Sequence, residues 1–172
     1  MFWKLTKKNR QTGFTLIEVM VSLAITGIIA LGASMASGQV LTQTSRNNDF
    51  TTVNRNALNA LYWISRDGQM AQTYDGEAAF PDADLTLGWV EWDHTINTAV
   101  YSLDDGKLTR HYSSGDDVSE MLVAEYISPD RDFTNCVSNN GVLTVTVTSS
   151  LGEGAKSINV TKVRDIVSRP KL

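Results

Sequence analysis

A long apolar stretch near the N-terminus constrains this chain more than any other feature. No ionisable side chain occurs between Glu18 and Arg46, and residues 19–37 are nearly all apolar or small. A helix needs about 20 such residues to cross the hydrocarbon core of a bilayer. The sequence therefore predicts one membrane-spanning helix.

The charges on either side of this stretch predict its orientation. Residues 1–13 carry four lysine or arginine side chains and no acid, whereas Arg46 is the first charged residue after the stretch. Short segments rich in positive charge stay on the cytoplasmic side of a membrane. We therefore expect a single-pass inner-membrane protein with a cytoplasmic N-terminus and a periplasmic or extracellular head.

A cleaved secretory signal would also begin with basic residues and an apolar run. This run is long for such a signal, and the usual cleavage site would fall inside a continuing helical pattern. In addition, Glu18 lies at the cytoplasmic end of the run, four residues after Phe14. An ionised acid next to hydrocarbon is costly unless a cation meets it, so Glu18 is a functional candidate. The alternative interpretation of Glu18 is that it is an acid in the first turn of a helix, favoured there only by the helix dipole.

The run KKNRQTGFTLIEV, residues 7–19, resembles the processing site of type IV prepilins and type II secretion pseudopilins. In that family a membrane aspartyl peptidase cleaves after the glycine and methylates the new amino terminus. The resemblance implies that residues 1–13 are a leader peptide, that cleavage falls between Gly13 and Phe14, and that Phe14 becomes N-methylated. It also implies that Glu18 pairs with the Phe14 amine of a neighbouring subunit during assembly.

The residue types suit this chemistry. Gly13 has no side chain, so the backbone can enter a protease site in an extended form. Cleavage would free a cationic amine at the membrane boundary, and pairing with Glu18 would offset the cost of holding two charges in a low dielectric.

Residues 14–40 are then expected to form the transmembrane and filament-core helix. Small residues in a membrane helix allow close helix approach. Many major pilins carry a proline near the position of Met35, and this chain does not, which favours a minor pilin or a pseudopilin. The small residues are Gly27, Gly32, Ala33 and Gly38.

Residues 41–172 are expected to form an amphipathic helix and a globular β-sheet head. Apolar residues from Phe50 to Ala71 recur at spacings of three and four, with Asp67 among the polar positions between them. One helix is expected from about residue 15 to about residue 73, with an interruption near residues 45–48 left open. Alternation with period two then predicts strands at 85–92, 96–103, 107–112, 121–127, 141–149 and 157–163.

These patterns predict an α+β, pilin-like fold in which the long N-terminal helix, first transmembrane and then amphipathic, packs on an antiparallel sheet. Asp105 and Gly106 predict a tight hairpin. The segments WISRD at 63–67 and VYSLDDGKLTR at 100–110 are similar to larger minor pilins of the J-type pseudopilin and W-type pilin groups. Such a subunit is expected at or near the filament tip, where it primes assembly. Its partners would be homologous subunits, the prepilin peptidase and the inner-membrane assembly platform.

No catalytic constellation occurs, so we expect a structural protein rather than an enzyme. His94 and His111 are too few for an all-histidine zinc site and lack ligand-like spacing to Cys136. Cys136 is the only cysteine, which excludes an intrachain disulfide. No cofactor is expected, although acid pairs in turns leave calcium open. The acid pairs are Asp82 with Asp84, Asp104 with Asp105, Asp116 with Asp117, and Asp130 with Asp132.

Two other classes of function stay open. Without residues 1–13 the chain keeps eleven basic and nineteen acidic residues, which argues against binding of nucleic acid. An anchored adhesin or DNA-uptake module remains the main alternative, with Trp89 and Trp92 as a candidate contact surface. A membrane enzyme or sensor would require an uncut bond between Gly13 and Phe14. The sequence does not specify whether the protein belongs to a type IV pilus, a type II secretion system or a competence pseudopilus.

Overall fold

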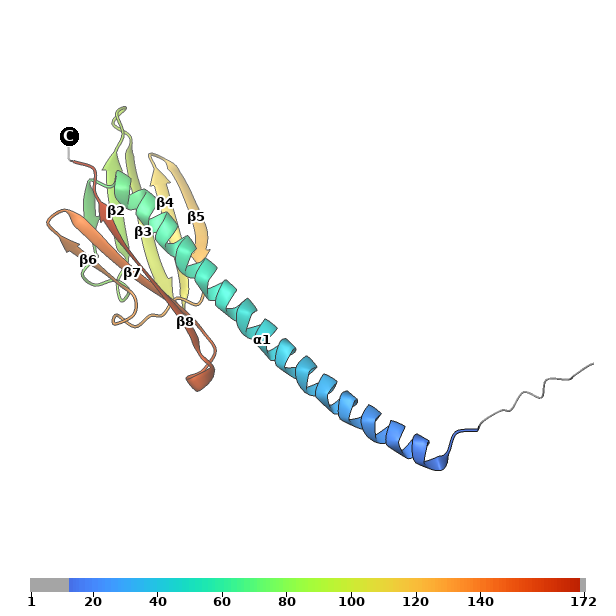
Figure 1. Cartoon of the computed structure of the whole chain (residues 1–172). Coiled ribbons are helices and arrows are strands. Elements are labelled where there is room, and N and C mark those ends of the chain that lie inside the picture. The colour runs from blue at the N-terminus through green and yellow to red at the C-terminus, as the bar shows by residue number, and fades with distance from the viewer. Residues whose placement is uncertain (1–12, 171–172) are drawn as a thin grey trace, which may run out of the picture. The chain divides into compact units, whose positions relative to one another are not determined.

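The computed structural model describes residues 13–170. Of the predicted leader only Gly13 is included, and residues 1–12 lie outside the described range. The chain divides into two compact units, Met1–Ser45 and Arg46–Leu172. Helix α1 (Leu16–Met70) contributes to both units (Figure 1).

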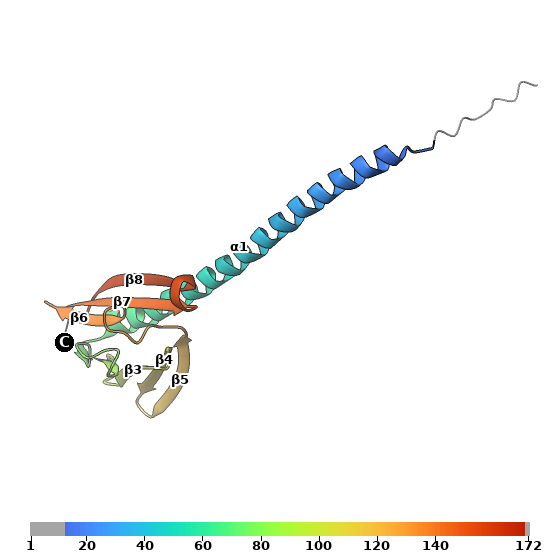
Figure 2. The same ribbon diagram turned by 90° about the horizontal axis from the view of Figure 1, so that it is seen from below.

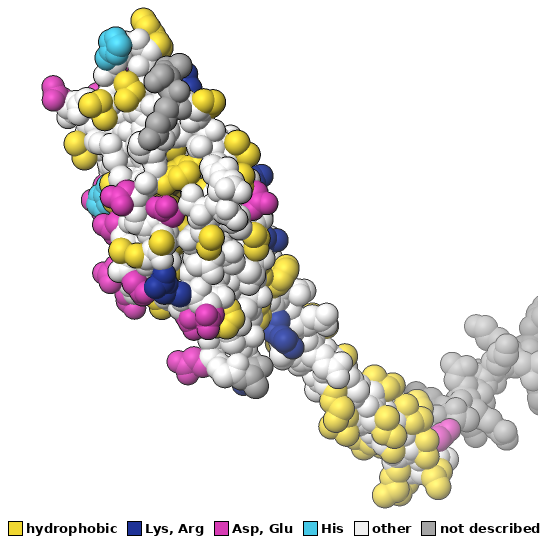
Figure 3. All heavy atoms as spheres, turned by 90° about the vertical axis from the view of Figure 1, so that its left-hand side faces the viewer, with side chains coloured by type: hydrophobic (Ala, Val, Ile, Leu, Met, Phe, Trp, Pro, Cys, Tyr) yellow, Lys and Arg dark blue, Asp and Glu magenta, His cyan; other side chains and the backbone are white. Residues whose placement is uncertain are grey.

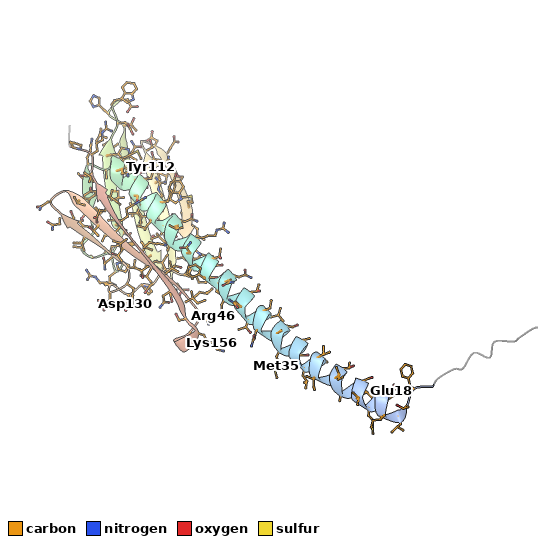
Figure 4. The ribbon with its side chains drawn as sticks, viewed as in Figure 1. Glu18, Met35, Arg46, Tyr112, Asp130 and Lys156 are labelled. Carbon is orange, nitrogen blue, oxygen red and sulfur yellow. The ribbon has the colours of Figure 1, made fainter. Side chains whose placement is uncertain are left out.

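The first unit consists of a short irregular segment followed by the first part of α1. Every residue from Gly13 to Ser45 is exposed. The helix is long and apolar enough to cross a membrane, and its most apolar stretch is not buried. Figure 3 shows hydrophobic side chains covering this part of the chain, and Figure 4 marks Glu18 and Met35 along it.

The second part of α1 has the predicted amphipathic pattern. Its buried positions follow the expected spacing, whereas Phe50 is 53% exposed. The interruption allowed near residues 45–48 does not occur: the hydroxyls of Thr51 and Thr52 donate to the carbonyls of Asn47 and Asn48 at 2.8 and 3.0 Å, within an unbroken helix. The buried apolar residues are Val53, Ala57, Ala60, Leu61 and Ile64.

The strands form two antiparallel sheets rather than the single sheet expected. The sheets have the orders β1-β2-β3-β4-β5 and β6-β7-β8. Figure 2 shows them as separate layers. The strands are β1 (Thr73–Asp75), β2 (Leu85–Val90), β3 (Ile96–Asp104), β4 (Lys107–Ser114), β5 (Asp117–Ala124), β6 (Asn135–Asn139), β7 (Val142–Leu151) and β8 (Ile158–Val167), with a short 3-10 helix, Gly154–Lys156, before β8.

One hydrophobic core joins α1 to both sheets. It includes Ile64 from the helix, Leu87 from the larger sheet and Val145 from the smaller one, and none of the three side chains is exposed to solvent. The predicted hairpin between β3 and β4 is confirmed, since Asp105 and Gly106 both have positive φ angles, 45° and 73°. The predicted α+β fold is therefore present, with a second sheet added.

A polar cluster lies inside this core and corrects one expectation. The sequence pattern predicts Asp67 on the polar face of α1, yet its side chain is fully buried. The Tyr101 hydroxyl donates to Asp67 Oδ2 at 2.5 Å, and Arg110 donates from Nε to Oδ2 at 2.6 Å and from Nη2 to Oδ1 at 3.0 Å. The guanidinium also lies 5.2 Å from the Trp63 ring centroid and 4.5 Å from that of Tyr112. Asp67 is buried because strand residues supply its partners.

Candidate processing and assembly site

The bond between Gly13 and Phe14 lies in an exposed, irregular segment just before α1. The Phe14 side chain is 87% exposed, and a Cβ atom added at Gly13 would meet no other atom within 4 Å. The fold of the described residues therefore neither shields this bond nor requires a glycine beside it. A requirement for glycine at position 13 would come from a processing enzyme.

Thr15 and Glu18 form a capping box at the start of α1. The Thr15 amide donates to Glu18 Oε2 at 2.9 Å, the Thr15 hydroxyl donates to the same oxygen at 2.9 Å, and the Glu18 amide faces the Thr15 hydroxyl at 3.4 Å. This reciprocal bonding of Thr-x-x-Glu satisfies amides that a helix start leaves without partners. The sequence carries the signal for this cap as TLIE, residues 15–18, which has the Thr-x-x-Glu spacing of a capping box.

The capping box positions the Glu18 carboxylate for a second partner. Both hydrogen bonds from Thr15 go to Oε2, and Oε1 accepts no hydrogen bond from the described residues. The carboxylate is also exposed. Phe14 directly precedes Thr15, so the carboxylate is held next to the residue that cleavage would make the amino terminus. An ammonium group that reached Oε1 would gain a charge-assisted hydrogen bond.

A shallow apolar groove follows the capping box along one face of α1. Its volume is about 320 Å³, and its lining includes Phe14, Val19 and Leu23. The hydroxyls of Ser22 and Thr26, which also line it, donate to the carbonyls of Glu18 and Ser22, each at 2.7 Å. Because these donors are satisfied within the helix, the face can be placed in lipid or against another helix at little cost.

The glycines of this helix are next to open space in the described part of the chain. A Cβ atom added at Gly27, Gly32 or Gly38 would meet nothing within 4 Å. Packing inside the chain therefore does not explain these glycines. They are available for the close helix approach that membrane helices make through small residues.

The other candidate residues do not come together in the head. His94 adopts a positive φ of 67° between β2 and β3, and His111 in β4 has its Nδ1 atom 3.9 Å from a carboxylate oxygen of Glu120. Cys136 is 2% exposed. Burial, followed by the nearby negative charge of Glu77, raises the pKa of its thiol to about 12. A buried, protonated thiol is a poor nucleophile.

Acidic side chains in turns of the head accept hydrogen bonds from backbone amides. Asp93 accepts a hydrogen bond from the Thr95 amide at 3.0 Å, which lowers the pKa of its carboxyl group. Asp130 Oδ1 accepts one from the Asp132 amide at 2.9 Å. Across residues 13–170, no three histidine, cysteine, aspartate or glutamate side chains are grouped as a metal site would require. The two tryptophans do not form one surface, because Trp89 is 3% exposed and stacks on Tyr112, whereas Trp92 is 86% exposed.

Comparison with known proteins identifies the N-terminal segment. Residues 8–34 match the family model described as the prokaryotic N-terminal methylation motif. This range includes Gly13, Phe14, the capping box and much of the apolar helix. No curated protein and no solved structure shows a recognisable match to the chain.

Proposed function

Because the chain carries the prepilin-type cleavage and methylation signature of type IV pilins and pseudopilins, we propose that it is a structural subunit of a pilus or pseudopilus filament. Its long apolar helix and this motif fit a membrane-anchored pilin. The observation that carries the proposal is the coincidence of the motif with an exposed bond after Gly13, directly before an unburied apolar helix. We propose cleavage of that bond and N-methylation of Phe14.

Glu18 acts in assembly according to this proposal. The capping box holds its carboxylate at the helix start with Oε1 open. In the membrane the ammonium group of Phe14 on a neighbouring subunit needs a counter-charge, because an unpaired ion in low dielectric is costly. Pairing of the two charges would align the second helix in a fixed register. The groove beside Phe14 and the glycines at 27, 32 and 38 would receive the neighbouring helix.

The orientation follows from charge. With residues 1–13 in the cytoplasm, the head from about residue 46 lies in the periplasm or outside the cell. The peptidase and the assembly platform then meet the chain at the inner membrane. The absence of proline near Met35 supports a minor pilin or pseudopilin that primes assembly at or near the tip.

Fractionation of sheared filaments tests this function. Full-length protein is made in its native cell and in a strain without prepilin peptidase, and sheared filaments are separated from membranes. The chain should enter the filament fraction only in the first strain and should remain in the membrane in the second. Equal amounts in both filament fractions, or none in either, would contradict the proposal. The head alone offers no comparable test, because the proposed contacts belong to α1.

A further inference from the structure

The charges of the head are segregated between two regions. Residues 73–132 contain fourteen acids and three basic residues, whereas residues 46–72 and 133–170 together contain seven basic residues and four acids. Figure 3 shows acidic side chains gathered along one side of the head. One chain therefore carries two surfaces of opposite charge, a pattern that favours contact between the unlike surfaces of two molecules.

The basic region contains an open groove between α1 and β8. Its volume is about 480 Å³. Three large apolar side chains on its walls are strongly exposed: Leu58 (48%), Tyr62 (55%) and Val163 (61%). Lys162 and Arg164 also line it. An apolar patch with a basic rim is typical of a site for an acidic, partly apolar partner.

The wall formed by β8 is also a free sheet edge. β8 pairs with β7 on one side, and no other described strand pairs with it on the other. An edge strand presents unpaired backbone amides and carbonyls, which can bind a further strand. On the helix side, Arg55 lies three residues before Leu58, on the same face of α1.

The acidic region contains an edge strand that matches this groove. β5 is the last strand of the five-stranded sheet and pairs only with β4 among the described strands. Val118 and Leu122 are 77% and 52% exposed, and Glu120 lies between them on the same face, with its side chain 67% exposed. β5 therefore combines exposed apolar side chains, an acid and a free backbone edge.

We propose that β5 of one copy docks in the α1–β8 groove of a second copy. Leu122 and Val118 would cover Leu58 and Tyr62, and Glu120 would meet Arg164. The two surfaces differ, so the contact is head-to-tail and leaves one groove and one β5 free at the ends of a row. This inference rests on the proposed function, because filament assembly is what would bring copies together in one orientation.

Cysteine cross-linking between two differently tagged full-length copies tests the contact. Both copies carry Cys136→Ala, one also carries Tyr62→Cys and the other Leu122→Cys, and a short bismaleimide is added to whole cells. A mixed-tag product is expected from this pair. Either variant expressed alone under both tags should give none. Val137→Cys replaces Leu122→Cys as the matched control, because Val137 is similarly exposed (55%) on β6.

Charge reversal adds a specific readout. Arg164→Glu in the groove copy should lower the mixed product roughly tenfold, and Glu120→Lys in the other copy should restore it. Absence of the product, an equal yield with Val137→Cys, a product from Tyr62→Cys alone, or no effect of Arg164→Glu would each overturn the docking. The N-terminus of the same samples separates the two proposals. Processed subunits without the cross-link refute only the docking, whereas an unprocessed chain refutes the proposed function.

Discussion

Arg110 donates two hydrogen bonds to the buried Asp67 carboxylate, from Nε at 2.6 Å and from Nη2 at 3.0 Å, although 43 positions separate the two residues. Burial lowers the pKa of Arg110, but its hydrogen bonds with Asp67 and the charge of Asp67 outweigh burial, so the pKa is raised overall. Burial, and then the charge of Asp67, also raises the pKa of Tyr101. The pair connects α1 to β4 and sets how the helix lies on the larger sheet.

Asp67→Asn should destabilise the head strongly. The substitution keeps the shape of the side chain but leaves the Arg110 guanidinium, only 11% exposed, without a counter-charge. Loss of one partner of a buried ion pair costs about 3–5 kcal/mol. Denaturant unfolding of the full-length protein in detergent, followed by near-ultraviolet circular dichroism, measures the change. Asp116→Asn, at an exposed turn, is the control and should change stability little; equal stability of the two variants would contradict this role of the pair.

Cys136 should make the head less stable at alkaline pH. Its pKa is raised from 9.0 to about 12 in the folded chain, so the unfolded thiol loses its proton first as the pH rises. The stability that the protonated thiol contributes is present below pH 9 and is lost progressively between pH 9 and about pH 12. It should cost about 1 kcal/mol between pH 9 and pH 10. Unfolding free energies at the two values measure the loss, which should be smaller in Cys136→Ala. An unchanged pH dependence in that variant would contradict the assignment.

The variants Glu18→Gln and Glu18→Ala should distinguish a role of Glu18 in helix capping from a role of its negative charge. Glutamine can keep the capping box with Thr15 but has no charge, whereas alanine loses both. If Glu18 pairs with a neighbouring amine, both variants should be cleaved normally and both should be depleted from filaments. Immunoblots of sheared filaments and membranes measure this. Normal incorporation of Glu18→Gln would assign Glu18 to capping alone.

Gly13→Val should block processing without affecting the head. A side chain at position 13 meets no atom of the described chain, so the fold tolerates it. Glycine lets the backbone approach a protein surface closely, and the branched side chain of valine would block that approach next to the cleaved bond. The variant should retain its leader and unfold at the wild-type denaturant midpoint. Removal of residues 1–13 at the normal rate would show that the glycine is not required for cleavage.

Local patterns predicted much of this fold. The apolar spacing of α1 and the alternation in β2, β3, β4, β7 and β8 depend on neighbours in sequence, which a single chain displays. β1 has three residues inside a segment that reads as a helix end, and β6, with the sequence NCVSN, lacks a clear apolar alternation. The division into two sheets depends on which edges pair, and no short pattern encodes that.

The residues of the candidate site and of the buried cluster could likewise be predicted only where their role depends on neighbours in sequence. Gly13, Phe14 and Glu18 could be proposed from the sequence because they belong to one short motif, whereas the capping role of Thr15 rests on the hydrogen bonds of the helix start. Asp67 was placed on the polar face because its partners, Tyr101 and Arg110, come from strands 34 and 43 positions later. The groove and the free edge of β5 could not be predicted from the sequence, because both depend on which strands pair in the two sheets.

Processing is tested most directly by the mass of the N-terminal peptide of the protein purified from its native cell. We expect a chain that begins at Phe14 and carries a methyl group on its amine. A chain that begins at Met1, or beyond the apolar part of α1, would contradict this expectation.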